Sequence, residues 1–254
     1  MLLDPTQIIV AVLCALLIGM AKGGLAGGLG MLAVPVLALV MDPRMAVAIT
    51  LPVLMISDFF AIGAYWGKEH RAHLKLLLAG AVVGVLIGAL TFQFVNEAMM
   101  RLLMGVIALG FVLLRWFGPE PKPVDPDTPA TALGLSMGAL SGFSSFTAHA
   151  GSPPVQIYLL PRKLDKASFQ ATVVVFFTLV NLIKLPPYIL LGQFTQPVLL
   201  IALMMVPPAG IGVYIGYKVQ KILPEKLFFR VMHALLFVTG AKLTYDGIVQ
   251  LMVR

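Results

Sequence analysis

Residues 138–154, GALSGFSSFTAHAGSPP, interrupt a chain that is otherwise apolar over most of its length. The stretch contains four serines, one threonine, one histidine and three glycines, and it ends in two prolines. These residues break helices or compete for backbone hydrogen bonds, so a continuous membrane-spanning helix is not expected here. Non-helical backbone at membrane depth is tolerated only where it is buried in protein or lines a wet cavity. The stretch therefore predicts a broken helix at such a place.

The composition of the whole chain is that of a membrane protein. Hydrophobic residues make up 59% of 254 residues and charged residues 11%, and the mean hydropathy is +0.97. A soluble domain carries roughly a quarter charged residues. The net charge of +7 lies in short loops between apolar runs, which the positive-inside rule explains without a nucleic-acid partner. We predict an all-α polytopic membrane protein in the lipid bilayer.

Apolar segments divide the chain into two similar halves. Two regions, 6–41 and 130–160, are long enough to cross a membrane once but are broken in the middle. A proline-rich polar linker, 118–129, separates the halves 1–117 and 130–254. The predicted full spans, three in each half, are 45–66, 76–95, 98–117, 167–190, 197–217 and 227–250.

The two broken regions match each other without gaps. A shift of 119 residues places Gly19 on Gly138, Gly23 on Gly142 and Pro35 on Pro154. The order of segments after each broken region is also the same. These matches predict two repeats, each made of one broken element followed by three spans.

The basic loops indicate how the repeats lie in the membrane. If each broken region is a re-entrant hairpin, loops 68–75, 115–122, 162–166 and 218–230 all face the cytoplasm and hold 12 of the 18 lysines and arginines. If each were a simple span, two basic loops would face opposite sides. With three crossings per repeat, the hairpin arrangement makes the repeats inverted, as in many secondary transporters. The two hairpin tips are then expected to meet near the bilayer midplane.

The tips carry the residues expected of a small-anion site. A broken helix exposes amides at the start of its second half, where the helix dipole is positive. We expect Ser152 to act as the N-cap of such a half-helix, with proline in its first turn. Asp58 and Asn181 are expected as supporting polar groups, with Asp58 paired to a cation or bonded to a tip. The predicted binding residues are Lys22, Gly23, Gly24, Gly27, Gly28, Gly30, Ser144, Ser145, Thr147, His149, Gly151 and Ser152.

Each of these residues also has a structural interpretation. Glycines in apolar helices often serve helix packing, Lys22 could extend to a headgroup, and His149 could be a neutral structural donor. Thr50 and Thr91 are expected to bond a carbonyl one turn back. Nearer the outer ends, snorkelling or pairing is expected of Lys184, Lys242 and Asp246.

Sequence motifs of enzymes, metals and cofactors are missing. The segment 142–146, GFSSF, lacks the last glycine of a Gly-x-Ser-x-Gly elbow, and no zinc-protease, Walker or dinucleotide motif is found. His70 and His73 are expected in a basic loop, where a metal would be repelled, and Cys14 is the only cysteine. We therefore expect no catalysis, no metal and no organic cofactor.

Two segments of the chain resemble the TauE/SafE-type sulfite exporter family. They are GMAKGGLAGGLGMLAVPVLAL, residues 19–39, and SFTAHAGSPPVQIYLLPRKLDKASFQATVVVFFTLVNLIKLPPY, residues 145–188. The resemblance extends over nearly the whole chain. It implies a multi-pass transporter of the bacterial cytoplasmic (inner) membrane for sulfite, sulfoacetate or related small organosulfur anions, usually acting in export.

The sequence thus predicts an exporter of a small oxyanion such as sulfite or an organosulfonate. Two alternatives stay open: a proton- or cation-linked carrier of another small substrate with Asp58 as ion ligand, and a non-transporting scaffold or intramembrane enzyme. Proton coupling through His149 is a hypothesis that normal transport and an unchanged pH profile in His149→Gln would refute. A homodimer is also left open.

Overall fold

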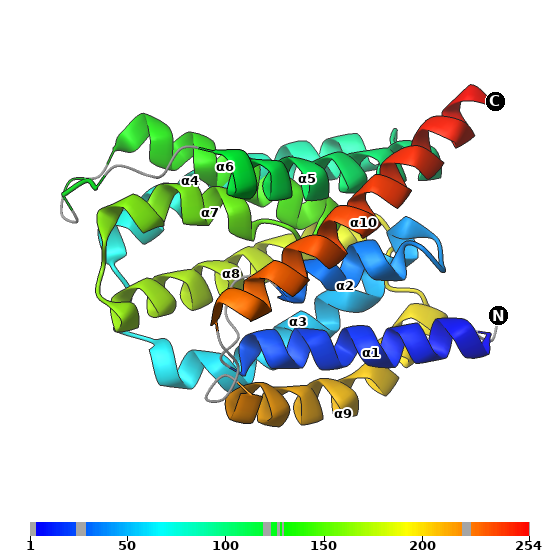
Figure 1. The fold of residues 1–254 in the computed structure, drawn as a ribbon, viewed down its shortest axis with the longest axis horizontal. Coiled ribbons are helices and arrows are strands. Elements are labelled where there is room, and N and C mark those ends of the chain that lie inside the picture. Colours follow the sequence, from blue (N-terminus) through cyan, green and yellow to red (C-terminus); the bar gives the residue numbers. More distant parts are fainter. Residues whose placement is uncertain are drawn as a thin grey trace.

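The computed structural model describes residues 4–23, 29–118, 123–125, 128, 130–219 and 225–253. These residues form helices and no strands, and most of the helices run along the long axis of the molecule (Figure 1). The first half contains α1 (Pro5–Lys22), α2 (Leu29–Leu37), α3 (Pro43–Tyr65), α4 (Arg71–Phe92) and α5 (Glu97–Phe117). The second contains α6 (Thr131–Ala148), α7 (Ser152–Leu159), a 3₁₀ turn (Leu160–Arg162), α8 (Lys166–Leu190), α9 (Gln196–Val219) and α10 (Glu225–Met252).

Six described helices are long and apolar enough to cross a membrane: α1, α3, α4, α5, α8 and α9. Five of them lie where full spans were predicted, and α1 lies in the first broken region. The remaining predicted span, 227–250, lies within the 28-residue helix α10. Aspartate and asparagine side chains fix the starts of several spans, because Asp42, Asn96 and Asp165 each accept hydrogen bonds from amides in the first turn.

Both broken regions consist of a long helix, a break and a short helix. α1 and α6 have 18 residues each, whereas α2 has nine and α7 has eight. At 1.5 Å per residue the long parts measure ~27 Å and the short parts ~12–14 Å. α2 packs against α1, and α7 against α6. In Figure 1, α1 begins at the end of the long axis where N and C are marked, and α6 begins at the opposite end.

The most extensive helix contacts stay the same when the two halves of the chain are exchanged. The most extensive contacts are α4 with α6, α5 with α10 and α1 with α9. In the two halves, α1 corresponds to α6, α4 to α9 and α5 to α10. Replacing each helix by its counterpart therefore turns the α4–α6 contact into the α9–α1 contact and leaves the α5–α10 contact unchanged. The weaker contacts of α3 with α9 and of α8 with α4 also correspond.

Glycines bring two of these helix pairs into backbone contact, and the contacts recur at equivalent positions. A Cβ added at Gly19 would meet the Ala209 carbonyl oxygen at 1.9 Å, and one added at Gly138 would meet that of Leu77 at 2.2 Å. The offsets between these contacts are 119 residues, from Gly19 to Gly138, and 132 residues, from Leu77 to Ala209. Two further pairs of contacts between a glycine and a backbone carbonyl are related by the same two offsets. The contact of Gly212 with Leu16 corresponds to that of Gly80 with Leu135, and the contact of Gly216 with Met20 corresponds to that of Gly84 with Ala139. Small residues of this kind allow helix backbones to approach closely in membranes.

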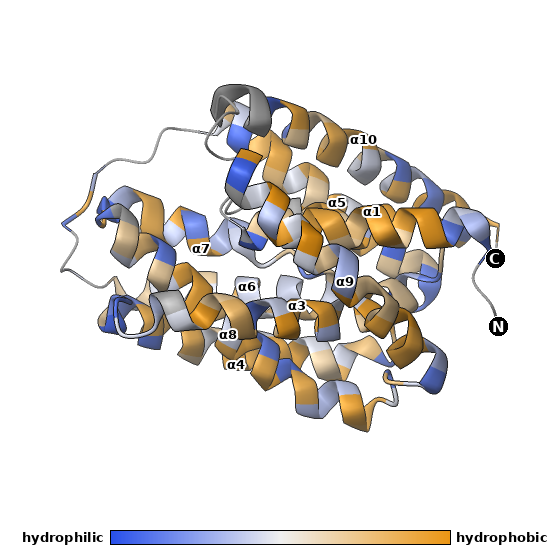
Figure 2. Cartoon of the chain, turned by 90° about the horizontal axis from the view of Figure 1, so that it is seen from below, coloured by the Kyte–Doolittle hydropathy of each residue, from blue (hydrophilic) through white to orange (hydrophobic). Residues whose placement is uncertain are grey.

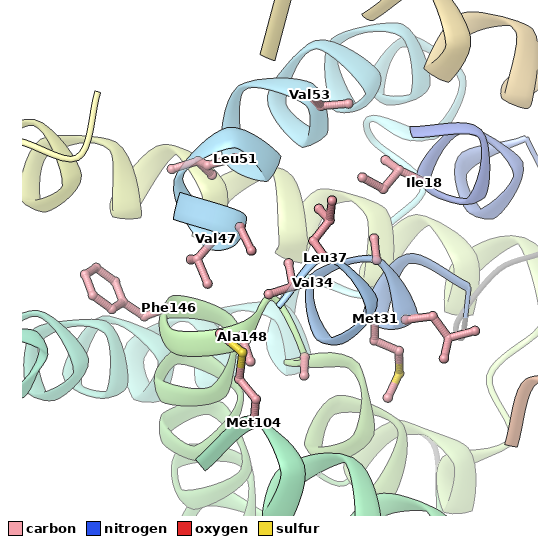
Figure 3. Packing of buried hydrophobic residues seen from close by; sticks show 14 of the residues in the cluster. Ile18, Met31, Val34, Leu37, Val47, Leu51, Val53, Met104, Phe146 and Ala148 are labelled. Atoms are coloured by element: carbon pink, nitrogen blue, oxygen red, sulfur yellow. The ribbon is translucent and has the colours of Figure 1, made fainter. Parts of the chain in front are cut away.

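The apolar core lies where the two broken regions meet α3. Figure 3 shows Val34 and Leu37 of α2 near Val47 of α3 and Ala148 of α6, all of them buried. Hydrophobic residues also predominate along most helices (Figure 2), and many of them lie on the outside, as Leu90 and Leu203 illustrate with 68% and 67% exposure. A chain that is apolar both inside and outside suits a lipid environment.

Candidate functional site

A small cavity lies between the breaks of the two broken regions. Its volume is about 110 Å³, below the roughly 300–1,000 Å³ of sites for drug-sized ligands. Apolar side chains of α3 and α8, such as Leu54 and Phe177, complete the walls. The polar side chains that line it are Lys22, Ser145, His149, Ser152, Gln170 and Asn181. The cavity therefore has room for a small ligand and polar groups from both breaks to hold it.

Asp58 of α3 connects one side of the cavity to α8. Lys22, in the last turn of α1, forms an ion pair with Asp58 Oδ1, and Asn181 Nδ2 donates to Asp58 Oδ2 at 2.6 Å. Asp58 is 1% exposed, and the Lys22 side chain is 17% exposed. The expected pairing of Asp58 with a cation is confirmed, and Lys22 does not extend to a headgroup. Because both carboxylate oxygens are occupied, this arrangement gives no support to Asp58 as a cation ligand.

His149 lies at the break of the second region, with a left-handed backbone (φ 50°) that ends α6. Its amide bonds back to Ser144 and Ser145 carbonyls. Its ring nitrogen Nε2 is 3.0 Å from the Val47 carbonyl oxygen. A carbonyl can only accept, so Nε2 carries a hydrogen and donates to it. His149 is thus a donor that ties the break to α3, and its Nδ1 faces α8.

Lys184 of α8 is the main correction to the predicted site. It was expected near an outer end, snorkelling or paired, but it is completely buried. Its Nζ lies 3.1 Å from both Ser145 O and Ser145 Oγ and 2.8 Å from His149 Nδ1. Spacing alone could have indicated this, because Asn181 and Lys184 are three residues apart and so share one face of a helix. By contrast, Lys242 and Asp246 pair with each other at 2.5 Å, which is one of the two outcomes expected for them.

One face of α8 therefore holds the end of α6. Tyr188 follows Lys184 by one turn, and its hydroxyl donates to the Phe146 carbonyl at 2.7 Å. The last carbonyls of a helix have no partner within the helix and form its negative end. Lys184 and Tyr188 satisfy these groups in α6, while Lys22 is the basic residue in the last turn of α1. Each long half-helix thus ends beside a lysine, although the two lysines occupy unrelated positions in their repeats.

Several predicted donors are used within the protein. The hydroxyls of Ser144 and Thr147 donate to Leu140 and Phe143 carbonyls, one turn back, and neither residue lines the cavity. Thr50 and Thr91 make the same kind of bond, as expected.

The backbone at the two breaks also differs in part from the expectation. The Gly23 amide bonds to the Gly19 carbonyl at 2.8 Å and is not free. Gly151 has no room for a side chain, because an added Cβ would meet the Ser141 carbonyl oxygen at 2.7 Å. The prediction that Ser152 is an N-cap is wrong: α7 starts at Ser152, and its hydroxyl accepts from Gln156 at 2.9 Å.

Some of the remaining predicted site residues lie within the described part of the chain, and others lie outside it. Gly30 lines the cavity, whereas Gly24, Gly27 and Gly28 lie outside the described residues. Gln170 lines the cavity from α8 and was not among the predicted binding residues. His73 does not lie in a loop but is buried in α4, 3.0 Å from the Tyr158 hydroxyl. Within the described residues, no group of three or more His, Cys, Asp or Glu side chains could hold a metal ion.

Comparison with known families gives one match. Residues 11–243 match the family described as Sulfite exporter TauE/SafE. The chain belongs to the TauE/SafE family. No curated protein and no solved structure matches the chain significantly. TauE/SafE membership and the six apolar helices make this a multi-pass membrane protein of a transporter family, and the TauE/SafE match includes both breaks and α8.

Proposed function

We propose that this TauE/SafE protein exports a small oxyanion, such as sulfite or an organosulfonate, across the bacterial cytoplasmic membrane. The observation that carries the proposal is the cavity between the two breaks, where donors from α1, α6 and α8 converge. The substrate is bound by Lys22, Gly30, Ser145 and Ser152, with Asn181 and Asp58 in support, and the His149 ring lines the site while its N–H donates to Val47. Gly23, Ser144, Thr147 and Gly151 shape the breaks around it.

An inverted repeat supports this proposal, because it places two equivalent breaks on either side of one site. Three observations favour inversion. The most extensive helix contacts are preserved when the halves are exchanged, the glycine contacts follow two constant offsets, and α1 and α6 begin at opposite ends of the molecule (Figure 1). In this arrangement the broken regions enter the bilayer from opposite faces, as the basic loops predict.

The membrane potential favours movement of an anion out of the cell. One negative charge leaving across 100 mV gains roughly 2.3 kcal/mol. An uncoupled carrier can therefore export its substrate against a moderate gradient. The single buried carboxylate of the described membrane helices, Asp58, is already bound by Lys22 and Asn181. This arrangement does not require a coupling cation.

Flux through purified protein in liposomes tests the proposal. We expect saturable uptake of radiolabelled sulfite, driven by an inside-positive potential and abolished by Lys22→Ala. Lys22→Arg keeps the charge and is expected to retain part of the flux, and Lys242→Ala is the control, because Lys242 is largely exposed and bound to Asp246. If folded protein transports neither sulfite nor any sulfonate, the proposal is wrong and a non-transporting role is favoured.

A further inference from the structure

The buried charges around the cavity do not balance. Two lysines, Lys22 and Lys184, and one buried carboxylate, Asp58, lie in this region, and Lys22 forms the ion pair with Asp58. In the described part of the chain, no carboxylate forms an ion pair with Lys184. A protonated Lys184 therefore has no counter-charge of its own among the described residues.

The partners of Lys184 satisfy its hydrogens but not its charge. An ammonium group has three N–H donors and no acceptor, and three neutral acceptors surround Nζ: Ser145 O, Ser145 Oγ and His149 Nδ1. Since His149 Nε2 donates to Val47, Nδ1 is the side of the ring that presents a lone pair to Lys184. The end of the α6 dipole offsets about half a charge at most.

The unbalanced charge lies directly behind the cavity wall. Ser145 and His149 both line the cavity, and both contact Lys184. An ion bound against these two residues therefore lies one side chain away from Nζ. A buried charge without a partner is costly, so an anion at this position is stabilised by the charge it neutralises.

From this arrangement we infer that Lys184 selects a singly charged anion, acting through Ser145 and His149. The inference rests on the proposed anion transport and narrows its substrate class to monoanions, such as a sulfonate or hydrogensulfite. One negative charge neutralises the cluster of Lys22, Asp58 and Lys184. A dianion such as sulfate would leave one negative charge uncompensated at the same depth.

Two tetrahedral probes of similar size and different charge test the inference: methanesulfonate, a monoanion, and sulfate, a dianion. Binding of each is measured by calorimetry to the full chain in lipid nanodiscs. Wild type is expected to bind methanesulfonate more tightly than sulfate. Lys184→Met should weaken methanesulfonate binding by about tenfold or more. Lys242→Met, the same substitution at an exposed and paired lysine, should leave both affinities unchanged.

A second variant changes the charge in the opposite direction. Asp58→Asn retains the shape of the side chain but raises the cluster from one net positive charge to two, so the preference should shift toward sulfate. The ratio of the two affinities is informative because a purely structural role of Lys184 would change both affinities together. Unchanged ratios in both variants overturn the inference even if wild type transports sulfite. If wild type binds neither probe and transports no sulfite, the proposed function itself fails.

Discussion

Asn181 donates its side-chain amide to the carboxylate of Asp58 across 2.6 Å, which joins α8 to α3 beside the cavity. The same carboxylate binds Lys22 at the end of α1. One buried side chain thus connects the first break to the two long helices that follow the breaks. Such a link sets the relative position of three elements, in addition to its effect on substrate binding.

Removing Asp58 should destabilise the protein. Asp58→Ala leaves the amine of Lys22 without its partner and is expected to lower the free energy of unfolding by about 3 kcal/mol, the cost typical of breaking a buried ion pair. The double variant Lys22→Met/Asp58→Ala should recover part of this loss, because no unpaired charge remains. Thermal unfolding in detergent micelles measures both. A double variant that is less stable than Asp58→Ala would contradict the assignment.

The crossing glycines should tolerate no side chain. Gly19→Ala and Gly138→Ala each place a Cβ against a carbonyl of the neighbouring helix, at 1.9 and 2.2 Å. Each substitution is expected to lower stability by about 1–3 kcal/mol, as overpacking does. Gly110→Ala in α5 is the matched control, because nothing lies within 4 Å of the added atom. It should be neutral or stabilising by up to about 1 kcal/mol. Similar melting temperatures for all three would refute the close crossings.

Adjacent serines at the second break should differ in function. Ser145→Ala removes a hydroxyl that lines the cavity and contacts Lys184, so sulfite affinity should fall by about tenfold. Ser144→Ala removes only bonds to the Leu140 and Ser141 carbonyls of the same helix, and its effect should stay within about twofold. The half-saturation constant of liposome flux gives the comparison. Equal effects of the two substitutions would count against the assigned positions.

The sidedness of three loops tests the inverted arrangement. Cysteines are introduced singly at Lys68, Lys163 and Thr195, which are exposed, whereas the native Cys14 is buried. A membrane-impermeant thiol reagent added to intact cells should label Thr195→Cys alone. Lys68→Cys and Lys163→Cys should react only after the membrane is opened. If the cysteines of Lys68→Cys and Lys163→Cys were instead labelled from opposite sides of the membrane, each broken region would be a simple span.

Much of the fold could be predicted because apolar length and helix-breaking residues act locally. The Pro-Pro pair after Gly151 and the glycines after Lys22 mark the two breaks, and the spans between polar loops are long enough to be unmistakable. The start of α4 is harder to place, since α4 begins at Arg71, inside the stretch that the sequence predicts to be a basic loop. A helix can extend beyond the hydrocarbon with a polar first turn, which hydropathy does not detect.

The site was predicted less completely because tertiary contacts decide it. Ser144, Ser145 and Thr147 have the same chemistry in the sequence, but only Ser145 faces the cavity, while the other two hydroxyls bond within α6. Lys184 was expected near an outer end because it lies in the last part of the predicted span 167–190. α8 does end at Leu190, but Lys184 is buried because α8 packs its side chain against Ser145 and His149.

The glycine crossings also constrain how such a protein can move. α1 belongs to the first half of the chain and is in backbone contact with α9 of the second, and α6 of the second half is in the same contact with α4 of the first. Atoms this close separate only by losing the whole interface, so each pair travels as one body. For the export proposed above, alternating exposure of the cavity would then divide the molecule between helix pairs that each combine one helix from each half of the chain.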